Sequence, residues 1–158
     1  MKEIHSSLPQ LLLDHPQLTS IAIHVGANDL KFKQTESHKD DFRSLIHSII
    51  SSNLSLIISG PFISPRYNDE QYSRMRALHV WLKGYCCNLS IPYVDNYALF
   101  FGCGGAFVWD GSLGGDRLHL NRLGARLLSQ SIELTAKSVA WTRRGIDGGP
   151  MPASPKKS

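Results

Sequence analysis

Hydrophobic positions along the chain follow two different periods, one typical of strands and one typical of helices. Short runs rich in β-branched residues, at 21–25, 54–59 and 91–95, predict buried strands. Between these runs apolar residues recur every three or four positions, which predicts amphipathic helices. The helical positions are Phe42, Leu45, Ile46, Ile49 and Ile50 in the first helix and Met75, Leu78, Leu82 and Tyr85 in the second. Strands that alternate with helices predict an α/β domain.

The ends of these elements follow from capping and turn residues. Residues 37–40, Ser-His-Lys-Asp, resemble a capping box, so the first helix is expected to begin there. The second helix is expected to end near Asn88, and residues 96–115, rich in glycine and aromatic residues, predict a long loop. A last helix is expected from about 120 to 132, because leucine and isoleucine recur there at helical spacing.

The last part of the chain has a different composition. Residues 1–141 are expected to form one domain, and residues 142–158, with Gly148-Gly149-Pro150 and further prolines, a disordered tail. This tail holds +3 of the net charge of +4, from Arg143, Arg144, Lys156 and Lys157 against Asp147, which leaves +1 for the rest. A nucleic-acid face on the folded part is therefore not indicated, and the tail is the candidate for weak RNA contact.

Two short motifs stand where chemistry is expected in an α/β fold. Gly26-Ala27-Asn28-Asp29 follows the strand at 21–25, at the edge of the sheet where ligands bind in such folds. Asp116-Arg117-Leu118-His119 places a carboxylate three residues before an imidazole, just ahead of the last helix. An aspartate in that position can orient a histidine base and stabilise its charged form.

These two motifs resemble the third and fifth sequence blocks of the SGNH, or GDSL-type, hydrolases. The resemblance implies a three-layer α/β/α fold with a parallel, flavodoxin-like sheet. It also implies that Asn28 donates a hydrogen bond to the oxyanion, with Gly26 in the motif loop, and that His119 acts as general base and acid, oriented by Asp116. The reaction would be hydrolysis of a carboxyl or acetyl ester, with an ester or lipid-like substrate and without metal or organic cofactor.

Residues 21–132 are more closely similar to the esterase domain encoded in the first open reading frame of vertebrate LINE-type retrotransposons. The similarity lies in Ile-His-Val-Gly-x-Asn-Asp at 23–29, Ser-Gly-Pro at 59–61 and His-x-Asn-Arg-x-Gly at 119–124. It implies an alternative from a different class, a non-catalytic binding or assembly module derived from a retrotransposon RNA-packaging protein.

The nucleophile block of the SGNH family, Gly-Asp-Ser, should precede residue 21 and is not there. Residues 1–20 contain Ser6, Ser7 and Ser20 but no such block, so we expect a domain without its first strand and with little or no turnover. Ser59 is the only other serine worth testing as a nucleophile. A missing first strand would leave the strand at 21–25 with an unpaired edge, which predicts self-association.

Composition and cysteine content indicate an intracellular domain of ordinary globular type. The chain has 158 residues, of which 42% are hydrophobic and 19% charged. Its cysteines, Cys86, Cys87 and Cys103, do not suggest a disulfide framework, and a buried structural role is expected for the adjacent pair. The apolar run at 11–13 is too short for a secretory signal or a membrane span, so we expect a cytoplasmic or nuclear protein.

Overall fold

The sheet has three parallel strands in the order β1-β2-β3. In the computed structural model, which describes residues 2–25, 35–101 and 119–146, these are β1 (Ser20–His24), β2 (Ser55–Ser59) and β3 (Tyr93–Val94). The register of the first pair runs from Ser20 opposite Ser55 to His24 opposite Ser59. Because the strands are parallel, their carboxyl ends meet at one edge of the sheet. β1 ends at that edge with His24, and residues 26–29 come soon after it in the sequence.

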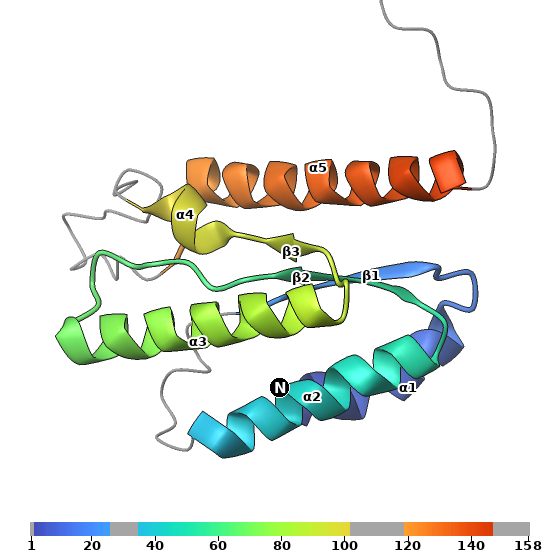
Figure 1. Ribbon diagram of the computed structural model, residues 1–158, viewed down its shortest axis with the longest axis horizontal. Coiled ribbons are helices and arrows are strands. Elements are labelled where there is room, and N and C mark those ends of the chain that lie inside the picture. The colour runs from blue at the N-terminus through green and yellow to red at the C-terminus, as the bar shows by residue number, and fades with distance from the viewer. Residues whose placement is uncertain (1, 26–34, 102–118, 147–158) are drawn as a thin grey trace, which may run out of the picture.

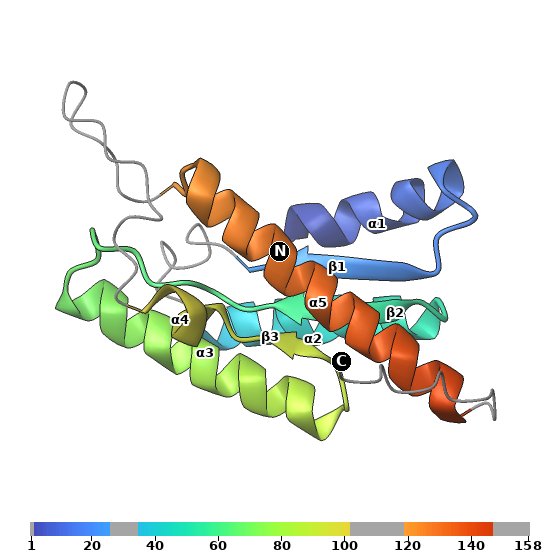
Figure 2. The ribbon, with the colours of Figure 1, turned by 90° about the horizontal axis from the view of Figure 1, so that it is seen from above.

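Helices cover both faces of the sheet. Figure 1 shows α1 (Lys2–Asp14), α2 (Thr35–Ser51) and α3 (Asp69–Asn88) below the sheet, and α5 (Arg122–Ile146) above it. The view from above in Figure 2 shows α5 crossing over the strands, with α1 on the β1 side and α3 on the β3 side. The short helix α4 (Asn96–Phe100) follows β3. This is the three-layer α/β/α arrangement that the resemblance to the SGNH hydrolases implies.

Most of the apolar core lies between the sheet and the lower helices. The principal cluster between the sheet and these helices contains Leu8, Ile23, Val25, Phe42, Leu45, Ile46, Ile49, Leu56, Ile58, Leu82, Cys86 and Ile91. Burial of each large apolar side chain stabilises the fold by about 1.5 to 3 kcal/mol. On the other face, Phe62 and Phe100 form a smaller buried cluster against which Leu120, Leu127 and Leu128 pack. This smaller cluster fixes the start of α5 next to the segment that follows β2.

Local hydrogen bonds explain where the elements begin. Asn68 caps α3 by accepting from the backbone N–H of Gln71, and the Gln71 side chain accepts in return from the Asn68 N–H. Asn121 accepts from the N–H of Gly124 in the first turn of α5. The end of α3 at Asn88 is as predicted.

Three boundaries differ from the predictions. The helix α2 begins at Thr35, so Ser37 lies inside the helix and does not cap it. Residues 96–100, predicted as the start of a loop, form α4 because the Asp95 carboxylate accepts from the N–H of Ala98 and caps that turn. The last helix was expected from about 120 to 132 and the tail from residue 142, whereas α5 runs from Arg122 to Ile146; residues 147–158 lie outside the described residues.

Candidate functional site

Of the four site residues predicted from the motifs, the structure describes one. His119 is exposed and lies three residues before the first residue of α5. Gly26, Asn28 and Asp116 lie outside the described residues, so their placement against His119 stays a prediction. The role of Asn28 at the carboxyl end of β1 therefore still rests on the sequence motif.

The packing of Leu120 ties His119 to the carboxyl edge of the sheet. Leu120 packs against the cluster of Phe62 and Phe100. The Phe62 ring in turn stacks on the ring of His24, the last residue of β1, with centroids 5.5 Å apart and planes 12° apart. The segment that carries His119 is thus connected through two side chains to the strand end that leads into residues 26–29.

Next to this aromatic contact, polar side chains from the ends of all three strands contact one another. His24 Nδ1 lies 3.1 Å from Ser59 Oγ at the end of β2. Asn96 is the first residue of α4, two positions after the end of β3. It donates from Nδ2 to Ser59 Oγ at 2.7 Å and to the Gly60 carbonyl oxygen at 2.6 Å. We call His24, Ser59 and Asn96 the inner cluster.

The three residues of the inner cluster differ in burial. Ser59 and Asn96 are fully buried, whereas His24 is half-buried. Asn96 Oδ1 is buried without a hydrogen-bond partner among the described residues. Since the Ser59 hydroxyl has no exposed surface, an acyl group cannot reach it in this conformation, which argues against Ser59 as a replacement nucleophile.

The sequence motifs do not point to Asn96, although it contacts the ends of two strands. The Ser59 contact makes His24 a histidine with a polar partner inside the fold. A signal for Asn96 was present, because polar residues stand at or just after the ends of all three predicted strands, and these ends share one edge in a parallel sheet. The contact itself cannot be predicted from local sequence, since Asn96 and Ser59 are 37 positions apart in the chain.

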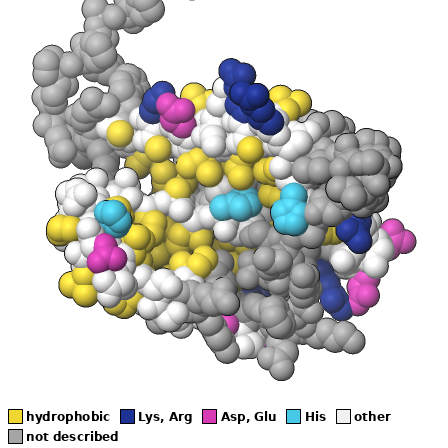
Figure 3. All heavy atoms as spheres, turned by 180° about the vertical axis from the view of Figure 1, so that it is seen from behind, with side chains coloured by type: hydrophobic (Ala, Val, Ile, Leu, Met, Phe, Trp, Pro, Cys, Tyr) yellow, Lys and Arg dark blue, Asp and Glu magenta, His cyan; other side chains and the backbone are white. Residues whose placement is uncertain are grey.

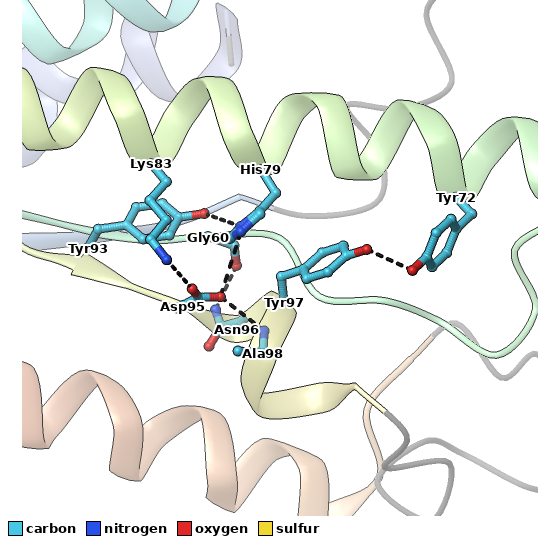
Figure 4. A network of polar contacts seen from close by, with 9 residues as sticks. All are labelled: Gly60, Tyr72, His79, Lys83, Tyr93, Asp95, Asn96, Tyr97 and Ala98. Carbon is cyan, nitrogen blue, oxygen red and sulfur yellow. Dashed lines mark hydrogen bonds and ion pairs between the residues drawn. The ribbon is translucent and has the colours of Figure 1, made fainter.

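A second group of polar side chains lies between α3, β3 and α4, and Figure 4 shows it. His79 Nδ1 lies 3.1 Å from the Tyr93 hydroxyl, and His79 Nε2 lies 3.9 Å from Asp95 Oδ1. Lys83 Nζ donates to Asp95 Oδ2 at 2.7 Å. The ring of Tyr97 stacks on His79 with centroids 4.6 Å apart. We call His79, Lys83, Tyr93, Asp95 and Tyr97 the outer cluster.

Electrostatics distinguish the members of the outer cluster. Burial lowers the pKa of His79, and neighbouring Lys83 adds to this, against the opposing effect of Asp95. Burial acts to raise the pKa of Asp95, but hydrogen bonds from Lys83 and from the Ala98 N–H outweigh it, so this pKa is lowered. At neutral pH the cluster therefore holds a neutral imidazole beside a carboxylate paired with an ammonium group.

Gly60 joins the two clusters. Its carbonyl oxygen accepts from Asn96, and the Tyr93 hydroxyl lies so close to its Cα that an added Cβ would overlap the hydroxyl oxygen. A glycine is required here for close approach, because any side chain would push Tyr93 away from β2.

Three further observations on the described residues concern metal ions, membranes and cysteines. No group of three or more His, Cys, Asp or Glu side chains that could hold a metal ion occurs among them. None of the described helices has the length and apolar character needed to cross a membrane. A buried role was expected for both adjacent cysteines. This is confirmed for Cys86, whose pKa burial raises to about 11, and it is wrong for Cys87, which is exposed.

The solved structures that are similar to this chain include two esterases. No protein-family model matches the chain, and no curated protein sequence matches it. The chain is similar to the esterase domain of the ZfL2-1 ORF1 protein from a zebrafish retrotransposon, with 37% identity, a TM-score of 0.58, and coverage of 72% of this chain and 70% of that one. It also resembles a catalytic mutant of Axe2, an acetylxylan esterase from Geobacillus stearothermophilus, with 16% identity, a TM-score of 0.68, and coverage of 85% of this chain and 66% of that one. At this low identity, the second similarity concerns the fold alone.

Proposed function

This chain belongs to the family of SGNH-like esterase domains, and from that membership we propose that it carries an ester-hydrolase site at the carboxyl edge of its sheet. The observation that carries the proposal is the 37% identity to the zebrafish retrotransposon esterase domain, over 72% of this chain. The position of His119, connected to the same edge through Leu120, is compatible with it. The substrate class is a carboxyl or acetyl ester.

Each motif residue has a defined role in this proposal. His119 removes a proton from the attacking group, and Asp116 orients the imidazole and stabilises its charged form. Asn28 donates a hydrogen bond to the oxyanion, and one such donor contributes about 3 kcal/mol to the stability of the transition state. The reaction requires no metal or organic cofactor.

The attacking group in this chain is water. The sequence contains no Gly-Asp-Ser, and Ser59 is fully buried. Without a serine beside the base, no acyl-enzyme forms and the nucleophile is poorly positioned, so turnover is very slow.

Hydrolysis of p-nitrophenyl acetate tests the proposal when two histidine variants are compared. His119→Ala should lower the rate to a background level. This background is the uncatalysed hydrolysis plus the non-specific reaction of the ester with exposed side chains. His47→Ala, which removes an exposed histidine from α2 in the lower layer, is the matched control and should keep the parent rate. Equal rates for the parent and both variants would overturn a catalytic role of His119.

One observation favours the assembly module as second candidate. In the sheet that the described residues form, β1 is an edge strand, and the segment 18–25 contains no Lys, Arg, Asp, Glu or Pro to protect that edge. Seen from behind, Figure 3 shows hydrophobic side chains gathered in a band below α5, on the side where Figure 2 places β1 and α1.

We propose a second copy of this chain as the partner at this edge, since two identical edge strands can pair antiparallel about a twofold axis. Multi-angle light scattering at tens of micromolar tests this. A dimer that Ala22→Lys converts to a monomer would support it, and a parent protein that is monomeric at this concentration would contradict it. The basic tail offers a separate test, because RNA retention that weakens with salt and disappears on deletion of residues 143–158 would indicate RNA contact.

A further inference from the structure

Backbone hydrogen bonds show which residues of β1 face the open edge of the sheet. The carbonyl oxygen of Thr19 accepts from the N–H of Ser55 at 3.0 Å, and the N–H of Val25 donates to the carbonyl oxygen of Ser59 at 2.9 Å. Successive residues of a strand direct their backbone groups to opposite sides. The odd-numbered residues of β1 therefore face β2, and the even-numbered residues face the edge where the described residues contain no further strand.

Two of the residues that face this edge are accessible to another chain. Ser20 and Ala22 are exposed, whereas the third, His24, is half-buried. Figure 2 places α1 on the same side of the sheet, and this helix carries three exposed large apolar side chains, Ile4, Leu11 and Leu13. The edge thus combines backbone groups that no described strand pairs with apolar side chains nearby, a combination typical of a surface that another chain covers.

We propose that two copies of this chain pair through β1 about a twofold axis at Ile21, with Ser20 of each copy opposite Ala22 of the other. This inference rests on the second candidate function, the dimer at this edge, and adds its register. Opposite residues of antiparallel strands exchange two backbone hydrogen bonds when both face the shared edge. This register pairs the two exposed residues with each other, whereas an axis at Ala22 would require the half-buried His24 opposite Ser20.

The register determines which side chains meet at the axis. Ile21 is half-buried and packs against the principal apolar cluster of its own copy. At the axis it faces Ile21 of the partner subunit as a non-hydrogen-bonded pair, with Cα atoms about 4.5 Å apart. The two isoleucines therefore connect the apolar cores of the two copies, and the two sheets become one continuous sheet.

The register also brings a residue of one copy to the ester site proposed for the other. Three positions from the axis, Leu18 of the partner subunit lies opposite His24, the last residue of β1. Opposite residues in an antiparallel pair have their side chains on the same face of the sheet. Each copy thus adds an apolar side chain at the carboxyl edge of its partner. Because the two strands run in opposite directions, the two carboxyl edges lie at opposite ends of the shared sheet.

Disulfide formation between single-cysteine variants of the full chain tests the register. Cys87→Ser and Cys103→Ser provide the background, which should give no covalent dimer itself, since Cys86 is buried. Ile21→Cys should form a covalent dimer on mild oxidation, because a disulfide requires Cα atoms about 4.4 to 6.8 Å apart. Ala22→Cys is the matched control and should stay monomeric on a non-reducing gel, since its partner copy is two residues out of register.

A mixture of two surface variants tests the same register without changing the core. Ser20→Cys and Ala22→Cys should give a covalent heterodimer when mixed, and neither should form one alone. A covalent dimer of Ala22→Cys in place of Ile21→Cys would overturn the register. A parent protein that light scattering shows to be monomeric would overturn the pairing altogether. Neither result depends on turnover, so the His119→Ala rate comparison tests the ester site separately.

Discussion

Two histidines of this chain each place Nδ1 3.1 Å from a hydroxyl oxygen, His24 against Ser59 and His79 against Tyr93. In the inner cluster a neutral amide, Asn96, donates to the hydroxyl and so fixes the direction of its hydrogen. In the outer cluster the imidazole faces Asp95 on its other side, with Lys83 close by. The same contact thus has a neutral, buried neighbour in one place and charged neighbours in the other.

The comparison shows that the charge and burial of the groups around an imidazole affect its response to pH more than its first hydrogen bond does. Neutral, fully buried partners make the inner cluster a rigid part of the strand ends. Charged and partly exposed partners make the outer cluster sensitive to pH and salt. We therefore expect the inner cluster to contribute more to the free energy of unfolding and the outer cluster to make stability depend on pH.

The largest expected effect comes from Gly60→Ala, because it damages both clusters at their junction. The new Cβ would displace Tyr93 and shift the carbonyl that Asn96 binds, so the free energy of unfolding should fall by about 3 kcal/mol. Gly84→Ala in α3 is the matched control, since an added Cβ there meets nothing and alanine favours a helix by about 0.5 to 1 kcal/mol. Urea unfolding followed by circular dichroism measures both, and equal effects would contradict the close packing at Gly60.

The next largest effect should be a difference in the free energy of unfolding between alanine variants of two adjacent residues. Asn96→Ala leaves two buried acceptors without their donor, the Gly60 carbonyl and Ser59 Oγ, and should lower the free energy of unfolding by about 2 kcal/mol. Asp95→Ala removes the cap of α4 and the contact with Lys83 near the surface, and should cost about 1 kcal/mol. The same urea unfolding curves test this order, and a larger loss for Asp95→Ala would reverse the assignment of the rigid cluster.

The smallest effect is a pH dependence specific to the outer cluster. Because the pKa of His79 is lowered in the folded state, the unfolded chain binds the proton more tightly, and stability should fall as pH drops below the ordinary histidine value of 6.5. Asp95 adds a loss at lower pH, since its lowered pKa stabilises the fold above the unfolded value of about 3.8 and this is lost as pH falls through the folded pKa.

His79→Gln keeps a polar side chain and does not titrate, so thermal unfolding between pH 7.5 and 5 should show a shallower pH dependence than in the parent. His47→Gln on the exposed side of α2 serves as the control and should retain the parent slope. A slope that His79→Gln leaves unchanged would place the pH response elsewhere.

The sequence was sufficient for the layer architecture and for most element boundaries. Hydrophobic period identified the strands that became β1, β2 and β3 and the helices α2 and α3, because burial in a parallel sheet demands those patterns. It missed α4, since a single turn capped by Asp95 has too few residues for a period to appear. It also placed the start of α2 two residues late, at a polar segment that resembles a cap.

The candidate site was less predictable than the fold. The two motifs pointed to Asn28, Asp116 and His119 through family resemblance, and of these the structure describes His119. The contact of His24, Ser59 and Asn96 depends on strand register and on the rotation of α4, which local sequence does not encode. Only the structure shows that residues from the ends of three strands contact one another.

Labelling with a fluorophosphonate probe, followed by mass spectrometry of the modified peptide, tests the central claim most directly. The claim is that this chain retains the base and lacks the nucleophile of an SGNH-like ester site. Folded parent protein should therefore give no serine adduct that His119→Ala removes. A stoichiometric adduct on Ser59 or another serine that disappears in His119→Ala would contradict the account and identify a working serine esterase.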